Sequence, residues 1–147
     1  MDLKWELAKD YGATHLIDLE KDDRPLETVQ RITNEKMGDV VVECTGAAYL
    51  VEMGLDLVKP AGRYVLVSTC GFNKVPLTTD KIVFNEITLY GGLGQSWDTE
   101  PAVEIINQRK YRLDKMITQT FPLEKADEAM RFFMENPDKT LRVAIKP

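Results

Sequence analysis

The sequence has 147 residues, of which 44% are hydrophobic and 29% charged, and its 19 basic and 24 acidic residues give a net charge of -5. This length allows one domain with a packed core, and this composition excludes an intrinsically disordered chain. The acidic balance argues against a nucleic-acid partner, and since the sequence has neither a long apolar run nor a signal peptide, we expect a cytoplasmic protein that contacts no membrane.

The first half of the chain alternates helical and strand-like patterns. In chain order these predict a helix at 2–11, a strand at 14–19, a helix at 22–33, a strand at 39–44, a helix at 47–58 closed by KPAG, and a strand at 63–68. Gly12 follows the first helix, where a helix C-terminus favours positive φ, and Pro25 lies in the first turn of the second. The strand DVVVEC is nearly continuous in β-branched residues, which is typical of a strand covered on both faces.

The second half continues the alternation. It predicts a short helix at 81–84, a strand at 86–92, helices at 98–110 and 121–136, and a final strand at 141–146. Asp98 or Thr99 would cap the helix that has Pro101 in its first turn. Strands that alternate with helices indicate an α/β fold, in which a parallel sheet has helices on both faces and right-handed crossovers. We expect residues 12–147 to form one unit.

Metal-binding and disulfide chemistry receive little support from the sequence. Cys44 and Cys70 are the only cysteines and end separate apolar runs, so we expect buried free thiols. His15 is the only histidine, and its position in an alternating run favours a structural role. Zinc requires about three or four nitrogen, sulfur or carboxylate ligands, and no such set is evident, so we predict no metal.

The carboxyl ends of the predicted strands are the expected place for a ligand. In parallel α/β sheets ligands lie beyond these ends, which places the loops after Glu43, Val67 and Tyr90 on one rim. Residues 45–46 and 91–94 in these loops are small and let backbone groups approach a ligand closely. The same glycines would also serve in tight turns, so the sequence leaves both interpretations open.

The sequence contains no recognisable phosphate-binding or catalytic motif. Gly92 and Gly94 begin a pattern like GxGxxG, but Trp97 occupies the third glycine position. No serine lies in GxSxG, and we assign no catalytic residue. Arg142 in the final apolar strand is either a solvated edge residue or a guanidinium directed at a ligand phosphate.

Five segments in this order resemble one known family. They are ELAKDYGATHLIDLE, GDVVVECTGA, LDLVKPAGRYVLVS, EITLYGGLG and ITQTFPLEKADEAMRFF. This set, which covers nearly the whole chain, is similar to the cofactor-binding domain of zinc-type medium-chain alcohol and polyol dehydrogenases. The resemblance implies a Rossmann-type fold, NAD or NADP as cofactor, and a parent reaction that transfers a hydride between an alcohol and the nicotinamide.

The resemblance also implies cofactor-binding residues, carried over by position. These are Lys4 and Cys44–Thr45–Gly46 near the riboses, Val67–Ser68–Thr69 and Leu93–Gly94 at the nicotinamide, and Arg142 near the pyrophosphate. The segment from Asn73 to Leu77 resembles the edge strand that pairs across the family's dimer axis.

Important parts of the family pattern have no counterpart in this sequence. Residues 1–147 begin after the positions of the first strand, the glycine-rich loop and the second strand with its ribose-binding acid, and the catalytic zinc domain has no match. A truncated Rossmann-type sheet is therefore expected, inactive alone, with cofactor binding weakened or lost and no zinc. A truncated gene product and an excised piece remain alternatives, and the substrate and the choice of NAD or NADP stay open.

The predicted truncation has a structural consequence. The absent strand pair would lie between 14–19 and 39–44, so a hydrophobic strand edge is exposed. Either 14–19 moves beside 39–44 or another chain fills the gap, which predicts a homo-oligomer formed through strand edges. A non-enzymatic oligomerising or partner-binding module, and one half of a two-chain enzyme, are the alternative functions.

Overall fold

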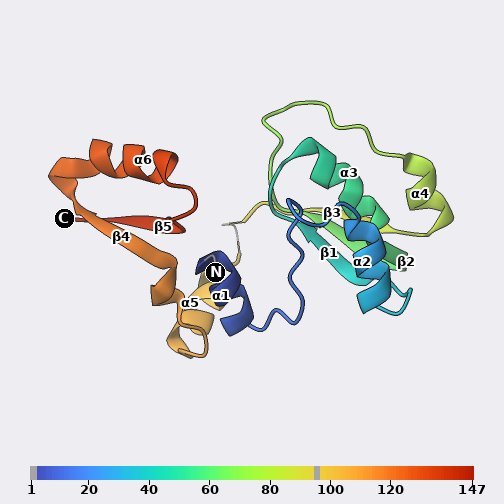
Figure 1. Cartoon of the computed structure of the whole chain (residues 1–147), viewed down its shortest axis with the longest axis horizontal. Helices are drawn as coiled ribbons and strands as arrows, with labels where there is room; N and C mark the ends of the chain where they lie inside the picture. Colours follow the sequence, from blue (N-terminus) through green and yellow to red (C-terminus); the bar gives the residue numbers. More distant parts are fainter. Residues whose placement is uncertain (1–2, 95–96) are drawn as a thin grey trace. The chain divides into compact units, whose positions relative to one another are not determined.

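A computed structural model describes residues 3–94 and 97–147 of the chain (Figure 1). The chain divides into two compact units, a terminal unit formed by Met1–Leu16 with Thr99–Pro147 and a central unit formed by Ile17–Asp98. This division differs from the single unit that we expected for 12–147. The reason is that the strands form two separate sheets, each with its own hydrogen-bond ladder.

The central unit contains a three-stranded parallel sheet. Its elements are α2 (Pro25–Ile32), β1 (Gly38–Glu43), α3 (Ala48–Asp56), β2 (Val58–Leu66), α4 (Thr79–Phe84) and β3 (Thr88–Gly91). The strand order is β1-β2-β3, so β2 is central and the other two strands are edges. The register places Val41 beside Tyr64 and Tyr64 beside Leu89.

Helix α3 packs against one face of this sheet and forms the core with it (Figure 1). Tyr64 is fully buried at the centre of the core, where its hydroxyl donates a hydrogen bond to the Val51 carbonyl at 2.6 Å. Leu55, Val58 and Ile87 complete the buried cluster. Since these side chains are almost completely buried, their burial is the main stabilising contribution to the unit.

The other face of the central sheet is open within this unit. Val40 is 46% exposed and Val42 is 52% exposed, although they belong to the strand that we expected to be covered on both faces. Alternation along a strand sends neighbouring side chains to opposite faces, so Val41 and Glu43 face the covered side and Val40 and Val42 the open one.

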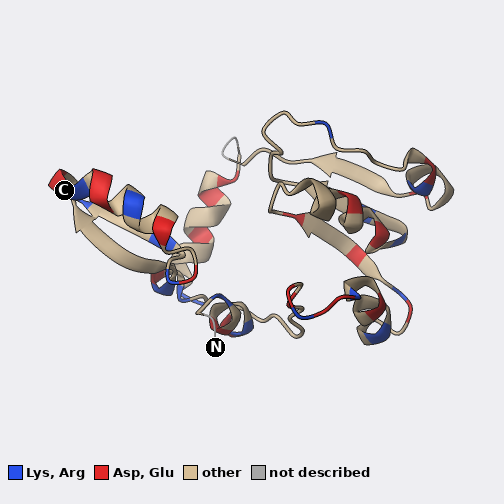
Figure 2. Cartoon of the chain, turned by 45° about the horizontal axis from the view of Figure 1, so that its top comes forward, with Lys and Arg blue, Asp and Glu red and all other residues tan. Residues whose placement is uncertain are grey.

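The terminal unit contains a second parallel sheet. Its elements are α1 (Leu3–Asp10), α5 (Thr99–Asn107), η1 (Leu113–Met116), β4 (Ile117–Pro122), η2 (Leu123–Lys125), α6 (Ala126–Glu135) and β5 (Arg142–Lys146). Helix α6 connects β4 to β5 and packs on both strands, with Ala129 buried and the rings of Phe121 and Phe132 5.8 Å apart. Charged residues lie mainly on helices and loops, and both signs are interspersed along α6 (Figure 2).

Helix α1 contacts the segment that leads into β4. Tyr11 meets the ring of Tyr111 edge to face at 6.0 Å, and its hydroxyl donates to the Arg112 carbonyl at 2.9 Å. Lys115 pairs with Asp10 at 2.8 Å. These contacts explain how residues a hundred or more positions apart belong to one unit.

Most of the predicted elements are confirmed, but three predictions about local structure are wrong. Residues 14–19 form no strand, because no described strand pairs with them, and the Asp18 carboxylate instead accepts from the amide of Glu20. The KPAG segment lies inside β2 as an irregularity of the ladder and does not close α3. Residues 121–122 belong to β4, a strand that the sequence analysis missed, so α6 begins only at Ala126.

None of the helices in the described parts of the chain combines the length and the apolarity that crossing a membrane requires. The α/β class with parallel strands is confirmed.

Candidate functional site

The carboxyl ends of the three central strands form the rim that the sequence predicted. Because β1, β2 and β3 are parallel, the loops after Glu43, Leu66 and Gly91 leave the sheet at the same edge. Backbone hydrogen bonds continue the sheet into two of these loops, with the Val67 amide donating to the Glu43 carbonyl at 3.1 Å and the Gly92 amide to the Leu66 carbonyl at 2.8 Å. The predicted rim is therefore a real structural feature.

Glu43 organises the rim, and the sequence analysis missed it. Its side chain is only 6% exposed, and the carboxylate accepts hydrogen bonds from the Ser68 hydroxyl, the Thr45 hydroxyl and the Thr45 amide. The Gly46 amide adds a further bond at 3.0 Å. One buried carboxylate thus fastens the loop after β1 to the loop after β2.

Two opposing effects act on the ionisation of Glu43. Burial raises the pKa of this carboxyl, but the hydrogen bonds from Ser68, Thr45 and Gly46 together outweigh burial and lower the pKa to about 2. The group is therefore ionised at neutral pH, and its negative charge is satisfied by protein donors. Burial, with a smaller effect of the Glu43 charge, raises the pKa of Tyr64 to about 12.

Gly46 is required where it stands. Its φ is +73°, and a Cβ atom added there would lie 2.3 Å from the Thr69 carbonyl oxygen. A side chain would therefore meet both backbone strain and a steric clash. The glycine is explained by the close packing of the two loops, with no need for a ligand.

The loop after β3 has a different character. Added Cβ atoms at Gly91 and Gly94 would meet nothing within 4 Å, and Leu93 is 86% exposed. At Gly92, by contrast, an added Cβ would lie 3.3 Å from the Val67 side chain. The loops held together by Glu43 are therefore closely packed, whereas the loop after β3 has open space at Gly91 and Gly94.

The predicted cofactor residues divide between the two units. Cys44, Thr45, Gly46, Val67, Ser68, Thr69, Leu93 and Gly94 lie on the rim of the central unit, whereas Lys4 and Arg142 belong to the terminal unit. Thr45 and Ser68 direct their hydroxyls to Glu43. In this structure those two side chains are bonded to the buried carboxylate and hold the two loops together.

The two predicted basic residues have distinct surroundings. Lys4 donates a hydrogen bond to the Pro137 carbonyl at 2.9 Å. Arg142 is exposed and borders a hollow of about 400 Å³ between α6 and β5, beside Met130, Phe133 and Ile145. Its guanidinium has no hydrogen-bond or ion-pair partner among residues 3–94 and 97–147.

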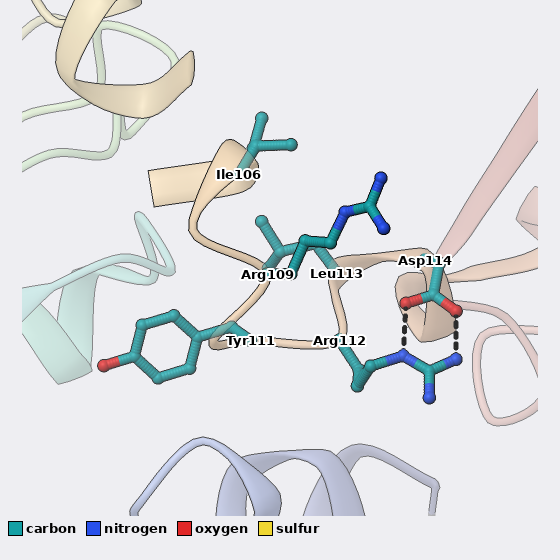
Figure 3. A pocket seen from close by; sticks show the side chains of 6 residues that line it. All are labelled: Ile106, Arg109, Tyr111, Arg112, Leu113 and Asp114. Atoms are coloured by element: carbon teal, nitrogen blue, oxygen red, sulfur yellow. Dashed lines mark hydrogen bonds and ion pairs between the residues drawn. The ribbon is translucent and has the colours of Figure 1, made fainter. Parts of the chain in front are cut away.

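A second hollow, of about 310 Å³, lies around the turn between α5 and β4 (Figure 3). Arg112 and Asp114 pair there through two bonds, at 2.9 and 2.7 Å, so their charges satisfy each other. The Arg109 side chain points away from this pair (Figure 3). The hollow is shallow and exposed, which gives it little capacity to orient a ligand.

The described residues contain no group of three or more His, Cys, Asp or Glu side chains that could hold a metal ion. Both cysteines are free as predicted, but the expectation of buried thiols is wrong, because Cys44 is exposed and Cys70 half-buried. His15 is exposed and lies 3.1 Å from the Thr14 hydroxyl, measured from its Nδ1 atom.

A nicotinamide cofactor fits part of this surface. The open space at Gly91 and Gly94 suits a planar amide that needs close approach. The amides of Thr45 and Gly46 are already engaged by Glu43, and the sequence has no glycine-rich phosphate loop. The residues present thus suit the nicotinamide end of the cofactor better than its pyrophosphate.

Comparisons with known proteins agree with the resemblance. The sequence profile described as "Zinc-binding dehydrogenase" matches residues 2–108. Sorbitol dehydrogenase of Bacillus subtilis is 28% identical over 145 residues, covering 99% of this chain and 41% of the relative. L-threonine 3-dehydrogenase of Pyrococcus horikoshii is 35% identical over 139 residues, covering 88% of this chain and 39% of the relative. The chain thus spans about two fifths of the length of these curated relatives.

Solved structures show the same fold. An alcohol dehydrogenase from E. coli CFT073 complexed with NADH has a TM-score of 0.86 at 18% identity, covering 100% of this chain and 42% of that one. A putative zinc-binding dehydrogenase from Sinorhizobium meliloti bound to NADP has a TM-score of 0.82 at 25% identity, covering 97% of this chain and 42% of that one.

Proposed function

Because the chain belongs to the zinc-binding dehydrogenase family, we propose that it is the C-terminal nucleotide-domain part of an NAD(P)-dependent zinc-type alcohol dehydrogenase. The observation that carries the proposal is the rim, where three parallel strands end together and open space lies at Gly91 and Gly94. The sorbitol and L-threonine dehydrogenases among the similar proteins, and the solved structures with NADH and NADP, support it.

In this proposal the residues of the chain hold and orient the cofactor. Backbone groups at Val67–Thr69 and Leu93–Gly94 bind the nicotinamide end, and Cys44–Gly46 lie beside the riboses. Glu43 acts through Thr45 and Ser68 by keeping the two loops in place. The resemblance assigns Arg142 to the pyrophosphate and Lys4 to the adenosine ribose, and the guanidinium of Arg142 has no partner in the described residues. The bound nicotinamide would exchange a hydride with an alcohol in the parent enzyme.

We expect these 147 residues alone to be inactive and to bind the cofactor weakly. The described residues offer no metal-binding group, so the Lewis-acid step of the parent reaction has no support in them. The sequence also lacks a glycine-rich turn, and a phosphate group would therefore lose the backbone donors and the helix dipole that usually hold it.

Calorimetric titration with NADH and NADPH tests this proposal. We expect binding with a dissociation constant above about 100 μM, equivalent to about −5.5 kcal/mol, for at least one cofactor. Gly94→Val, which fills open space at the rim, should weaken this binding further, whereas Ala102→Val on exposed α5 should leave it unchanged. Absence of binding at millimolar cofactor, or equal effects of both variants, would contradict the proposed site.

A second candidate function is a non-enzymatic module that oligomerises. The observation that favours it is the open face of the central sheet, where Val40 and Val42 are about half exposed. Such a module requires self-association but no cofactor. The mass of the chain in solution, measured beside the titration, separates the two functions.

A further inference from the structure

The Ser68 hydroxyl lies between the two loops that Glu43 holds together. It follows β2 and donates a hydrogen bond to the Glu43 carboxylate at the end of β1. Ser68 is half-buried, so part of the residue remains accessible at the rim. The register pairs Leu66 with Gly91, and the Gly92 amide donates to the Leu66 carbonyl at 2.8 Å. Ser68 therefore lies two residues beyond the strand pair that borders the open space at Gly91.

The two carboxylate oxygens of Glu43 accept from different sets of donors. Oε1 accepts from the Thr45 amide at 2.7 Å, from the Thr45 hydroxyl, and from the Gly46 amide at 3.0 Å. Oε2 accepts from the Ser68 hydroxyl and, at 3.2 Å, from the Gly46 amide. Within the described parts of the chain, Ser68 is thus the one side chain that donates to Oε2.

This arrangement fixes the direction of the hydrogen bond between Ser68 and Glu43. Burial opposes ionisation, but the hydrogen bonds lower the pKa of Glu43 to about 2, so at neutral pH the carboxylate can only accept. A hydroxyl has one proton and two lone pairs, and Ser68 uses its proton for the carboxylate. No donor among residues 3–94 and 97–147 uses its lone pairs. Toward a ligand, the Ser68 hydroxyl is therefore an acceptor.

Two neighbouring hydroxyls differ from Ser68 in this respect. The Thr45 hydroxyl also donates to Glu43, but it accepts from the Ala47 amide at 3.1 Å, so one of its lone pairs is used within the loop. The Thr69 hydroxyl has no partner in the described residues and can rotate either to donate or to accept. Of these three hydroxyls, only that of Ser68 combines a fixed direction with two free lone pairs.

We propose that the Ser68 hydroxyl accepts a hydrogen bond from the nicotinamide half of the cofactor, and that Glu43 is the positioning residue that keeps this hydroxyl in its acceptor orientation. The inference rests on the proposed function, to which it adds a contact made by a side chain. The nicotinamide half has two kinds of donor, the N–H groups of the carboxamide and the hydroxyls of its ribose. Either can pair with a free lone pair, whereas a phosphate oxygen would find no proton there.

The bonds of Glu43 indicate what Glu43→Gln does to this orientation. Three donors meet at Oε1, so the carbonyl oxygen of the new amide should occupy that position, and its NH2 group should take the place of Oε2. This NH2 group would donate to the Ser68 hydroxyl, whose own proton would then turn toward the ligand. The substitution therefore changes Ser68 from an acceptor into a donor.

Calorimetric titration of the 147-residue chain tests the proposal, with NADH or NADPH, whichever the wild type binds more tightly. We expect Ser68→Ala to raise the dissociation constant about three- to tenfold, the range that one net hydrogen bond supplies. Thr88→Val is the matched control, because it removes an exposed hydroxyl at the amino end of β3, away from the rim. It should leave the affinity unchanged, and circular dichroism should show that all variants remain folded.

A double substitution tests the positioning role of Glu43. If Glu43 fixes the orientation of the Ser68 hydroxyl, Ser68→Ala should have little further effect on affinity in a Glu43→Gln background. If Glu43 only supported the loops, the single substitution would weaken binding, but the effect of Ser68→Ala would be the same in both backgrounds. An undiminished effect in the Glu43→Gln background would overturn the positioning role.

Two cofactor analogues identify the donor. In one an acetyl group replaces the carboxamide, which removes its N–H groups, and in the other the nicotinamide ribose lacks both hydroxyls. The effect of Ser68→Ala should disappear with the acetyl analogue if the carboxamide is the donor, and with the deoxy analogue if the ribose is. An effect that persists with both analogues would come from altered loop structure and would overturn the proposal.

Failure of this inference and failure of the proposed function give different results. Absence of binding by the wild-type chain at millimolar cofactor contradicts the proposed function, and this inference with it. Binding by the wild type that Ser68→Ala leaves unchanged overturns this inference alone.

Discussion

Glu43 shows how one residue can determine the geometry of a rim while leaving few of its polar groups for a ligand. Its carboxylate gathers donors from Thr45, Gly46 and Ser68, three residues that the family resemblance places at the cofactor. The resemblance points to these loops, but it could not reveal that an acid beneath them uses their donors. The available signal was an acidic residue at the end of an apolar strand, just before small polar residues.

The ionisation of Glu43 predicts a dependence of stability on pH. Its pKa falls from 4.5 to about 2 in the folded chain, so the carboxylate stabilises the fold above pH 4.5, and this contribution is lost as the pH falls toward 2. The shift corresponds to at most on the order of 3 kcal/mol. Urea unfolding between pH 6 and pH 2 should show this loss.

Glu43→Gln is the variant that isolates this effect. It should be less stable than the wild type at pH 6, and the difference should shrink as the pH falls. Part of the pH dependence will remain, because Asp18, Asp22 and Asp39 also have lowered pKa values, from bonds with Lys21, Thr28 and Lys59 respectively. A constant difference between the two proteins across the range would exclude Glu43 as a source.

Gly46 gives a second prediction at the scale of one residue. Gly46→Ala should lower the free energy of unfolding by about 2 kcal/mol or more, because it combines a positive φ with a clash against the Thr69 carbonyl. Gly71 has a similar φ of +61°, but an added Cβ would meet only Asn73, at 3.6 Å. Gly71→Ala should therefore cost about 1 kcal/mol. Equal losses in urea unfolding would show that the clash does not matter.

The elements show which parts of a fold the local sequence determines. Helical periodicity and proline at the first turn predicted α2, and the apolar runs predicted β1, β2 and β3. Residues 14–19 have the alternation of a strand but no partner to pair with, and a strand without a ladder is not stable. Alternation of apolar and polar residues shows which face of a segment could be buried in a sheet. Whether the segment becomes a strand depends on a neighbouring strand being present.

Coverage of a strand is likewise decided by other elements. The run of β-branched residues in β1 predicted burial on both faces, but α3 covers only the face that contains Val41. The sequence of β1 cannot show whether a second layer is present. In the same way, only the order of the strands in the sheet shows that β1 has a neighbour on one side among the described residues.

Close contact between α3 and β2 gives a prediction at the scale of elements. A Cβ atom added at Gly54 would lie 2.3 Å from the Tyr64 hydroxyl oxygen and under 3.0 Å from its ring. Gly54→Ala should therefore destabilise the central unit by about 2 kcal/mol, although alanine favours helices. Gly91→Ala is the control, because it meets nothing within 4 Å. A stabilised Gly54→Ala variant in thermal unfolding would show that the packing is loose.

At the scale of the whole molecule, the two units have separate hydrophobic contacts and separate ladders. Tyr64 is buried among residues of the central unit, and Ala129 is buried against β4 and β5 of the terminal unit. One chain can therefore contain two regions of different stability, as local opening in other proteins shows.

This separation predicts how damage to one unit spreads. Tyr64→Ala removes the largest buried side chain of the central core and should increase amide hydrogen exchange in β1 and β2, with little change in β4 and β5. Ala129→Asp buries a charge beneath α6 and should have the reciprocal effect, with faster exchange confined to the terminal unit. Mass spectrometry of peptides from each unit would measure both. If either substitution accelerated exchange in all four strands equally, the two units would unfold as one cooperative structure. The division of the chain would then not correspond to two regions of separate stability.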